Sequence, residues 1–189
     1  MSLSKHLWHR YARTQWLVLL LCAVFSSASY AETEFNIAQY TLGSGDIIQI
    51  KVFGQTDLTL KTRLSNDGVI NYPLLGVINV LGMTAKELET HIYQGLLGDY
   101  LVTPSVAVSI EEYRPFFIDG EINRPGGYPY QPGLTIDKAA ALAGGYTQRA
   151  SKTLIVVIRE INGETQRLDV DAAHEVFPGD SIKINKTFF

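Results

Sequence analysis

Hydrophobic and polar residues alternate along several stretches of the chain, and this is the pattern of half-buried β-strands. The alternation runs from Ile48 to Val52, and it returns at Leu58 to Leu64 and at Val106 to Ile110. Near the end of the chain it occurs once more, at Ile182 to Ile184. The pattern therefore predicts a fold built mainly from strands, each with one face toward a core.

Two stretches instead have the helical spacing of apolar residues. Thr84 and Glu87 open the first with the spacing of a capping box, so we interpret Glu87 as a helix cap rather than a catalytic acid. The second begins at Thr135 and ends at the pair Gly144 and Gly145, which favours a left-handed helix end. Its apolar stripe is made of small residues, so we expect this helix to lie close to a sheet. With the strands, these helices predict the α+β class.

Glycine-containing turns are predicted between the strands. Gly43-Ser44-Gly45-Asp46 precedes the first strand, and Asn66-Asp67-Gly68 predicts a hairpin between the strands on either side of it. A phosphate-binding loop is excluded at Gly43 to Asp46, because a strand follows where a helix is required and no Lys-Ser or Lys-Thr pair follows. Gly179-Asp180-x-Ile182-x-Ile184 resembles Gly45-Asp46-x-Ile48-x-Ile50, and we interpret the likeness as shared turn chemistry rather than a repeat.

The N-terminal segment has the layout of a secretory signal peptide, with basic residues, an apolar run from Trp16 to Phe25 and small residues after it. We predict cleavage between Ala31 and Glu32. The apolar run has ten residues, whereas a membrane-spanning helix needs about 20. Leu21 stands where a lipoprotein has a small residue before its cysteine, so we predict that Cys22 carries no lipid.

The charge of the predicted mature chain is acidic. The signal segment holds three of the 16 Lys and Arg and none of the 19 Asp and Glu, which leaves 13 basic and 19 acidic residues. This balance argues against nucleic acid as a partner, because nucleic-acid binding requires a basic face.

The sequence contains no arrangement of residues that demands catalysis or a cofactor. Its histidines form no ligand pair, no cysteine follows the signal segment, and Glu111 and Glu112 are adjacent in a strand and point to opposite faces. We therefore predict no catalytic residues, no metal site and no cofactor. Tyr128 and Tyr130 share one face of an extended segment, and we consider them as glycan contacts because aromatic rings stack on sugars; core packing is the alternative.

The stretch from Phe117 to Tyr146 resembles the soluble-ligand-binding β-grasp (SLBB) module. The resemblance rests on a strand, a proline-glycine turn, a second strand, a threonine-capped helix and a Gly-Gly end in that order. The positions that carry it are Gly120, Glu121, Pro125, Gly126, Gly144 and Gly145.

The preceding stretch resembles the polysaccharide-export (PES) domain of the Wza-like outer-membrane polysaccharide export proteins. Its motifs are Tyr40-x-Leu42-x-x-Gly45-Asp46, Asp67-Gly68-x-Ile70-x-x-Pro73, Gly82-x-Thr84-x-x-Glu87 and Pro104-x-Val106. An SLBB module directly after a PES domain is the arrangement of that family. With the predicted signal peptide at 1–31, the resemblance divides the rest of the chain into a PES domain of strands with one or two helices at 32–113 and a β-grasp-like SLBB domain at 114–189.

The family resemblance implies a function without catalysis. We expect a periplasmic component of capsular or exopolysaccharide export that forms a ring, by resemblance an octamer, around the polysaccharide chain. An inner-membrane copolymerase is the partner that the resemblance implies. The sequence departs from the long members of the family, because nine residues follow Asp180 where those members have a C-terminal membrane helix. We therefore expect a short form, peripheral to the outer membrane, that passes the polysaccharide to a separate β-barrel. The alternative is a monomeric periplasmic protein that binds a glycan or cofactor through its SLBB module.

Overall fold

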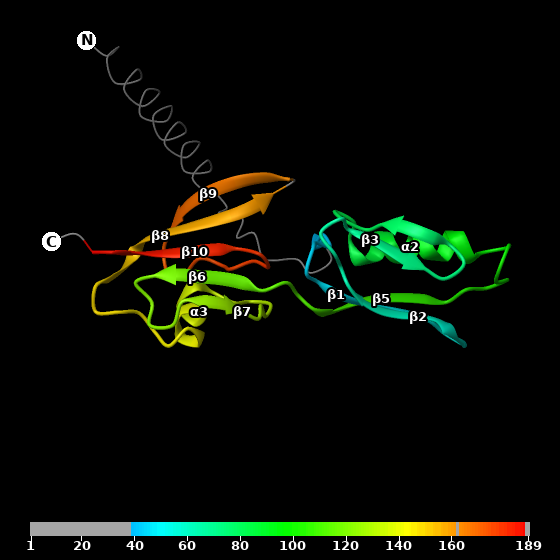
Figure 1. Ribbon diagram of the computed structural model, residues 1–189, viewed down its shortest axis with the longest axis horizontal. Helices are drawn as coiled ribbons and strands as arrows, with labels where there is room; N and C mark the ends of the chain where they lie inside the picture. Colours follow the sequence, from blue (N-terminus) through cyan, green and yellow to red (C-terminus); the bar gives the residue numbers. More distant parts are fainter. Residues whose placement is uncertain (1–38, 162, 188–189) are drawn as a thin grey trace, which may run out of the picture. The chain divides into compact units, whose positions relative to one another are not determined.

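The computed structural model describes residues 39–161 and 163–187 (Figure 1). The predicted signal peptide, with Cys22 and the cleavage site at Ala31 and Glu32, lies outside the described residues. In chain order the elements are β1 (Ile47–Val52), β2 (Gln55–Arg63), β3 (Val69–Tyr72), β4 (Gly76–Asn79), α2 (Ala85–Leu96), β5 (Val106–Glu112), β6 (Phe116–Gly120), β7 (Gly126–Tyr128), α3 (Ile136–Leu142), β8 (Ala150–Ile161), β9 (Glu164–Val170) and β10 (Ser181–Lys186). Strands with two helices confirm the predicted α+β class.

The first part of the fold is an antiparallel sheet with the order β2-β1-β5. Ile48 and Ile50 of the central strand are fully buried, as the alternating pattern predicted. Helix α2 packs against β5 and buries the side chains of Leu88, Ile92 and Leu96. Burial of these residues in one hydrophobic cluster stabilises this part of the fold.

The hairpin predicted at Asn66-Asp67-Gly68 is wrong. Strand β2 pairs with β1, to which it is joined by the tight turn at Phe53 and Gly54, and it does not pair with β3. Strand β3 instead pairs with β4, and the two are joined by the turn that contains Pro73. Residues 66–68 therefore redirect the chain from one sheet to another. A turn motif fixes a local change of direction, whereas the pairing of the strands is decided by the longer-range packing of their buried faces.

The second part of the fold is a five-stranded sheet with the order β7-β6-β10-β8-β9. The last strand, β10, lies between β6 and β8 and is parallel to β6 and antiparallel to β8. Figure 1 shows β10 in red between these neighbours. The core side of this sheet and helix α3 form a second hydrophobic cluster, which includes the small residues predicted for that purpose, Ala139, Ala140 and Ala143.

Candidate functional site

The two Gly-Asp motifs fold into the same local turn. In the first Gly-Asp turn, residues 43–46, the amide of Asp46 donates to the carbonyl of Gly43 at 3.2 Å and the Asp46 carboxylate accepts from the amide of Gly43 at 2.8 Å. In the second Gly-Asp turn, residues 177–180, Asp180 and Phe177 make the same two bonds at the same distances. Each aspartate thus holds the turn that leads into a central strand, which agrees with our interpretation as turn chemistry.

The carboxylate of Asp46 is fully buried and accepts hydrogen bonds from three donors. The hydroxyl of Tyr40 lies 2.8 Å and 3.0 Å from its two oxygens, and the amides of Gly43 and Arg114 donate at 2.8 Å and 2.7 Å. Burial is the main reason why the pKa of the Tyr40 hydroxyl is raised, and the negative charge of Asp46 acts in the same direction. Tyr40 therefore stays protonated and acts as a donor rather than as an acid or base.

The carboxylate of Asp180 is also fully buried, and its main partner is Arg159 of β8. The guanidinium donates from Nε and Nη2 to the two carboxylate oxygens at 2.8 Å each, which is the bidentate geometry. Nη2 also donates to the carbonyl of Glu175 at 3.0 Å, and the guanidinium carbon lies 3.9 Å from the centre of the Phe177 ring. The sequence analysis did not identify Arg159, because the motif shows the aspartate but not its partner.

Three tyrosine rings lie in a row where the two parts of the fold are joined. Tyr113 makes edge-to-face contacts with Tyr40 at 5.1 Å and with Tyr130 at 5.4 Å between ring centres. Burial raises the pKa of the Tyr130 hydroxyl to about 12. The sequence analysis considered Tyr130 as a glycan contact, but its ring is only 6 % exposed and therefore has little free surface for a sugar.

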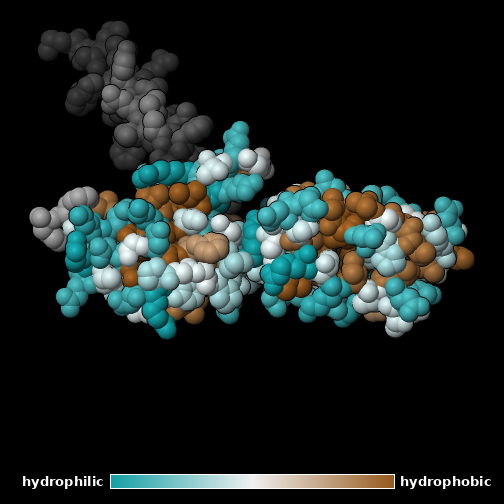
Figure 2. All heavy atoms as spheres, in the orientation of Figure 1, coloured by the Kyte–Doolittle hydropathy of each residue, from teal (hydrophilic) through white to brown (hydrophobic). Residues whose placement is uncertain are grey.

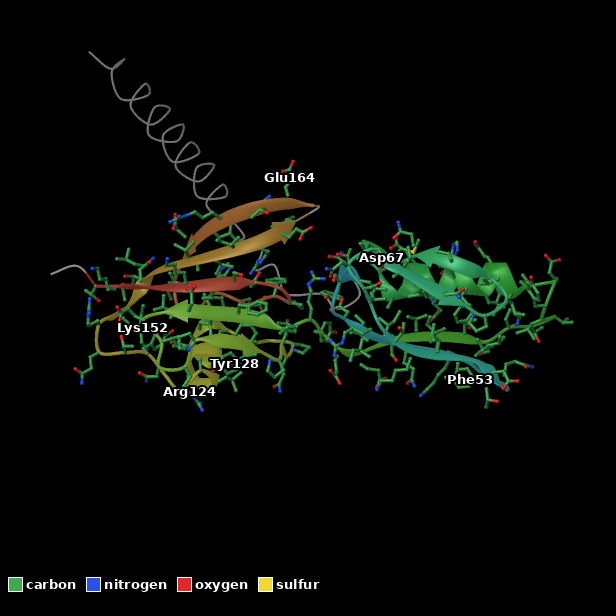
Figure 3. All side chains as sticks on the ribbon, viewed as in Figure 1. Phe53, Asp67, Arg124, Tyr128, Lys152 and Glu164 are labelled. Carbon is green, nitrogen blue, oxygen red and sulfur yellow. The ribbon has the colours of Figure 1, made fainter. Side chains whose placement is uncertain are left out.

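Tyr128 is half-buried and lies at the end of β7. Its ring stacks on Phe116 at 6.0 Å, and its hydroxyl donates to the carbonyl of Arg124 at 2.7 Å. Figure 3 shows Tyr128 and Arg124 at the same turn. Because the residue is only partly buried, we retain Tyr128 as a candidate glycan contact.

The other motif positions of the second domain fix the loop between β6 and β7 against the end of α3. Asn123 and Arg124, which lie between Glu121 and Pro125, donate their backbone amides to the carbonyls of Gly145 and Ala143. Gly144 and Gly145 have φ of 82° and 88°, which is the predicted left-handed helix end. The hydroxyl of Thr147 donates to the Glu121 carboxylate at 2.5 Å. Pro125 and Gly126 complete the loop and begin β7.

The motif positions of the first domain are likewise structural. Thr84 and Glu87 form the predicted capping box, with backbone-to-side-chain distances of 2.7 Å and 3.1 Å, and the bond from the Thr84 amide lowers the pKa of Glu87. The side chain of Ser65 donates to Asp67, which lowers the pKa of that carboxyl. Gly68 leaves room for Leu81, because a Cβ at position 68 would lie 1.8 Å from the Cγ of Leu81.

Several large hydrophobic residues in the first part of the fold are exposed, and the sequence alone did not identify them. Those in turns and loops are Phe53, Leu74, Leu97, Tyr100 and Val102, of which Phe53 is 66 % and Val102 87 % exposed. The Tyr100 hydroxyl donates to the carbonyl of Leu74 at 3.3 Å. Figure 2 shows hydrophobic residues gathered on the part of the surface that contains β3 and α2, and Figure 3 places Phe53 at the turn from β1 to β2.

The histidine and acidic side chains of the described residues do not gather into a metal site. Within residues 39–161 and 163–187, no group of three or more His, Cys, Asp and Glu side chains is placed to hold a metal ion. His91 is exposed on α2, whereas the Nε2 of His174 is buried without a hydrogen-bond partner. Burial, together with the nearby charge of Arg159, lowers the pKa of His174. None of the helices in the described part of the chain is both long and apolar enough to cross a membrane.

Comparisons with known proteins match both parts of the chain. Residues 36–111 match the family model described as polysaccharide biosynthesis/export protein, and residues 115–169 match the model of the SLBB domain. The exopolysaccharide production protein ExoF of Rhizobium meliloti is 32 % identical over 142 residues, which cover 68 % of this chain and 32 % of ExoF. The EPS I polysaccharide export outer membrane protein EpsA is 28 % identical in Ralstonia nicotianae and 27 % identical in Ralstonia solanacearum, over 132 residues in each case. Those matches cover 56 % of this chain and 34 % and 35 % of the two EpsA proteins. The chain thus spans about a third of the length of the curated relatives that it matches.

Proposed function

Because the chain belongs to the family of Wza-like polysaccharide export proteins, we propose that it is a periplasmic component of an exopolysaccharide or capsule export machine. Several copies form a ring around the path of the nascent polysaccharide. The single observation that carries the proposal is the match of an export domain followed directly by an SLBB domain, over residues 36–111 and 115–169.

The role of the chain in this proposal is mechanical rather than catalytic. The motif residues are used as turn formers, helix caps and buried hydrogen-bond partners, which suits a scaffold. Among the described strands, β2, β5, β7 and β9 are the outer strands of the two larger sheets, and several large hydrophobic side chains, such as those of Phe53 and Val102, are exposed. Unpaired edges and apolar surfaces are the features that self-association uses.

The proposed location is the periplasm, which the chain reaches through the signal peptide with cleavage between Ala31 and Glu32. We propose that the ring is peripheral to the outer membrane and carries no lipid at Cys22. An inner-membrane polysaccharide copolymerase delivers the chain to the ring, and a separate outer-membrane β-barrel receives it. The names of the EpsA relatives, which place those proteins in outer-membrane export, support this assignment to the cell envelope.

A second candidate function is a monomeric binder of a periplasmic glycan through the SLBB module. The partly accessible ring of Tyr128 is the observation that favours it, because an aromatic face can stack on a sugar. The two functions differ in self-association, which only the export ring requires.

Export of polysaccharide tests the proposed function in the cell. In a strain that lacks this chain, we expect secreted exopolysaccharide to be lost and polymer to remain inside the cell envelope, because the path across the periplasm is broken. Secreted polymer is measured in the medium and retained polymer in the envelope fraction. Restoring the wild-type chain is expected to restore secretion. Unchanged secretion in the deletion strain would contradict the export function.

A further inference from the structure

The residue that joins the two Gly-Asp turns is Arg114, and its backbone and side chain both take part. The amide of Arg114 donates to Asp46 of the first Gly-Asp turn at 2.7 Å, and its Nη1 lies 3.7 Å from the same carboxylate. The Nε of Arg114 donates to the carbonyl of Pro178 in the second Gly-Asp turn at 3.2 Å. One side chain therefore contacts the turn before β1 and the turn before β10.

The glycines of both turns supply the space that the Arg114 side chain occupies. A Cβ at Gly43 would lie 1.5 Å from Nη1 of Arg114, and a Cβ at Gly179 would lie 2.7 Å from Nε. A Cβ at Gly45 would lie 3.3 Å from the Cβ of Arg114. The φ of Gly43 is outside the left-handed region, so its backbone does not require glycine, and contact with Arg114 is the steric reason for glycine there.

The neighbours of Arg114 are held in the same region. The ring of Tyr113 contacts Tyr40 on one side and Tyr130 on the other, and the guanidinium carbon of Arg114 lies 5.6 Å from the centre of the Tyr40 ring. The amide of Phe117 donates to the carbonyl of Asp180 at 2.8 Å. The segment between β5 and β6 is therefore fixed by contacts to both turns, unlike a linker that is free in solvent.

We propose that Arg114 fixes the polysaccharide-export (PES) domain and the SLBB domain relative to one another. We call this set of contacts the clasp. The guanidinium of Arg114 lies between the two Gly-Asp turns, so the two motifs together form one binding site for this side chain. This gives Gly43 and Asp46 a role in positioning the domains, in addition to forming a turn. The proposal concerns the junction within one chain and does not depend on the ring.

Distances between spin labels on the two domains test the clasp. Cys22, the one native cysteine, is replaced with serine, and labels are attached at Thr59→Cys on β2 and Gln166→Cys on β9, both of which are exposed positions. Labelled chain is mixed with an excess of unlabelled chain, so that distances within one chain dominate. We expect one narrow distance distribution in the parent and loss of that narrow peak in Arg114→Ala. The backbone bond from residue 114 to Asp46 remains in this variant, and Asp46 keeps its bonds from Tyr40 and Gly43.

Two further variants make the test specific. Gly43→Ala is expected to broaden the distance distribution as Arg114→Ala does, because the new Cβ takes the place of Nη1. In the Arg114→Ala background, Gly43→Ala is expected to cause no further broadening. Arg124→Ala removes an arginine that bonds to the carbonyl of Leu142 within one domain, and it should leave the peak narrow. A narrow peak in Arg114→Ala, or equal effects of Gly43→Ala in both backgrounds, would overturn the clasp.

Discussion

Replacing Gly120 with alanine is expected to lower the free energy of unfolding by about 3 kcal/mol or more, near the upper end for single substitutions. Gly120 ends β6 with φ of 86°, a conformation that costs a residue with a side chain about 1–2 kcal/mol. A Cβ at this position would also lie 2.2 Å from the carbonyl oxygen of Ile184 in β10. That oxygen belongs to the backbone and cannot turn away as a flexible side chain can, so β6 and β10 must move apart.

The matched control for Gly120 is Gly133→Ala in the same domain. Gly133 has a similar φ of 75°, but a Cβ there would have no heavy atom within 4 Å. We expect Gly133→Ala to cost only the backbone strain, about 1 kcal/mol. Urea unfolding followed by circular dichroism gives both values. Equal losses in the two variants would show that the contact with β10 is not the cause.

Removing the carboxylate of Asp180 is expected to have the second large effect. In Asp180→Ala the guanidinium of Arg159 loses both of its short bonds while its side chain is only 14 % exposed. Leaving one partner of a buried ion pair uncompensated costs about 3–5 kcal/mol. The amide of Phe177 also loses its acceptor, which loosens the turn into β10. We therefore expect a large fall in the melting temperature, measured by calorimetry.

The control for Asp180 is the ion pair of Arg167 and Asp169 on β9, in the same domain. Its two side chains are 70 % and 79 % exposed and their charged atoms lie 3.6 Å apart. Exposed pairs of this kind contribute little to stability, so Asp169→Ala should melt at the parental temperature. If Asp180→Ala also melted there, the buried pair would not stabilise the fold as we describe.

The sequence predicted the local elements of this fold because each depends on residues close together in the chain. Thr84 and Glu87 are three residues apart, and they form the expected capping box. The alternation around Ile48 and Ile50 likewise predicted a strand with one buried face. The periodicity of a strand and the chemistry of a cap are visible in a single sequence.

The sequence did not predict the arrangement that depends on distant partners. The position of β10 between β6 and β8 is set by burial of Ile182 and Ile184 in a core that the whole domain supplies. A similar reason explains why β3 pairs with β4 rather than with β2. A turn motif lies on each side of β3, so the turns alone do not decide which neighbouring strand is its partner. Pairing of this kind cannot be deduced from the strand alone.

For the candidate site, the sequence identified residues that belong to local motifs but not the contacts between residues far apart in the chain. Asp46 was identified through its motif, but its contact with Arg114 joins positions 68 residues apart and left no local pattern. Tyr128 and Tyr130 were considered together because alternate residues of an extended segment share a face, yet the sequence could not show that the ring of Tyr130 would be buried against Tyr113. The exposed hydrophobic residues of the turns and loops were not identified, because the exposure of a side chain such as that of Phe53 depends on the whole fold.

The mass of the exported chain in solution tests the central claim, which is assembly into a ring, most directly. The full chain has a mass of 21.0 kDa, and analytical ultracentrifugation of the purified exported protein measures how many copies associate. We predict one discrete species that contains several copies and persists on dilution, as a closed ring does. A species with the mass of a single chain at every concentration would contradict the ring and favour the monomeric glycan binder.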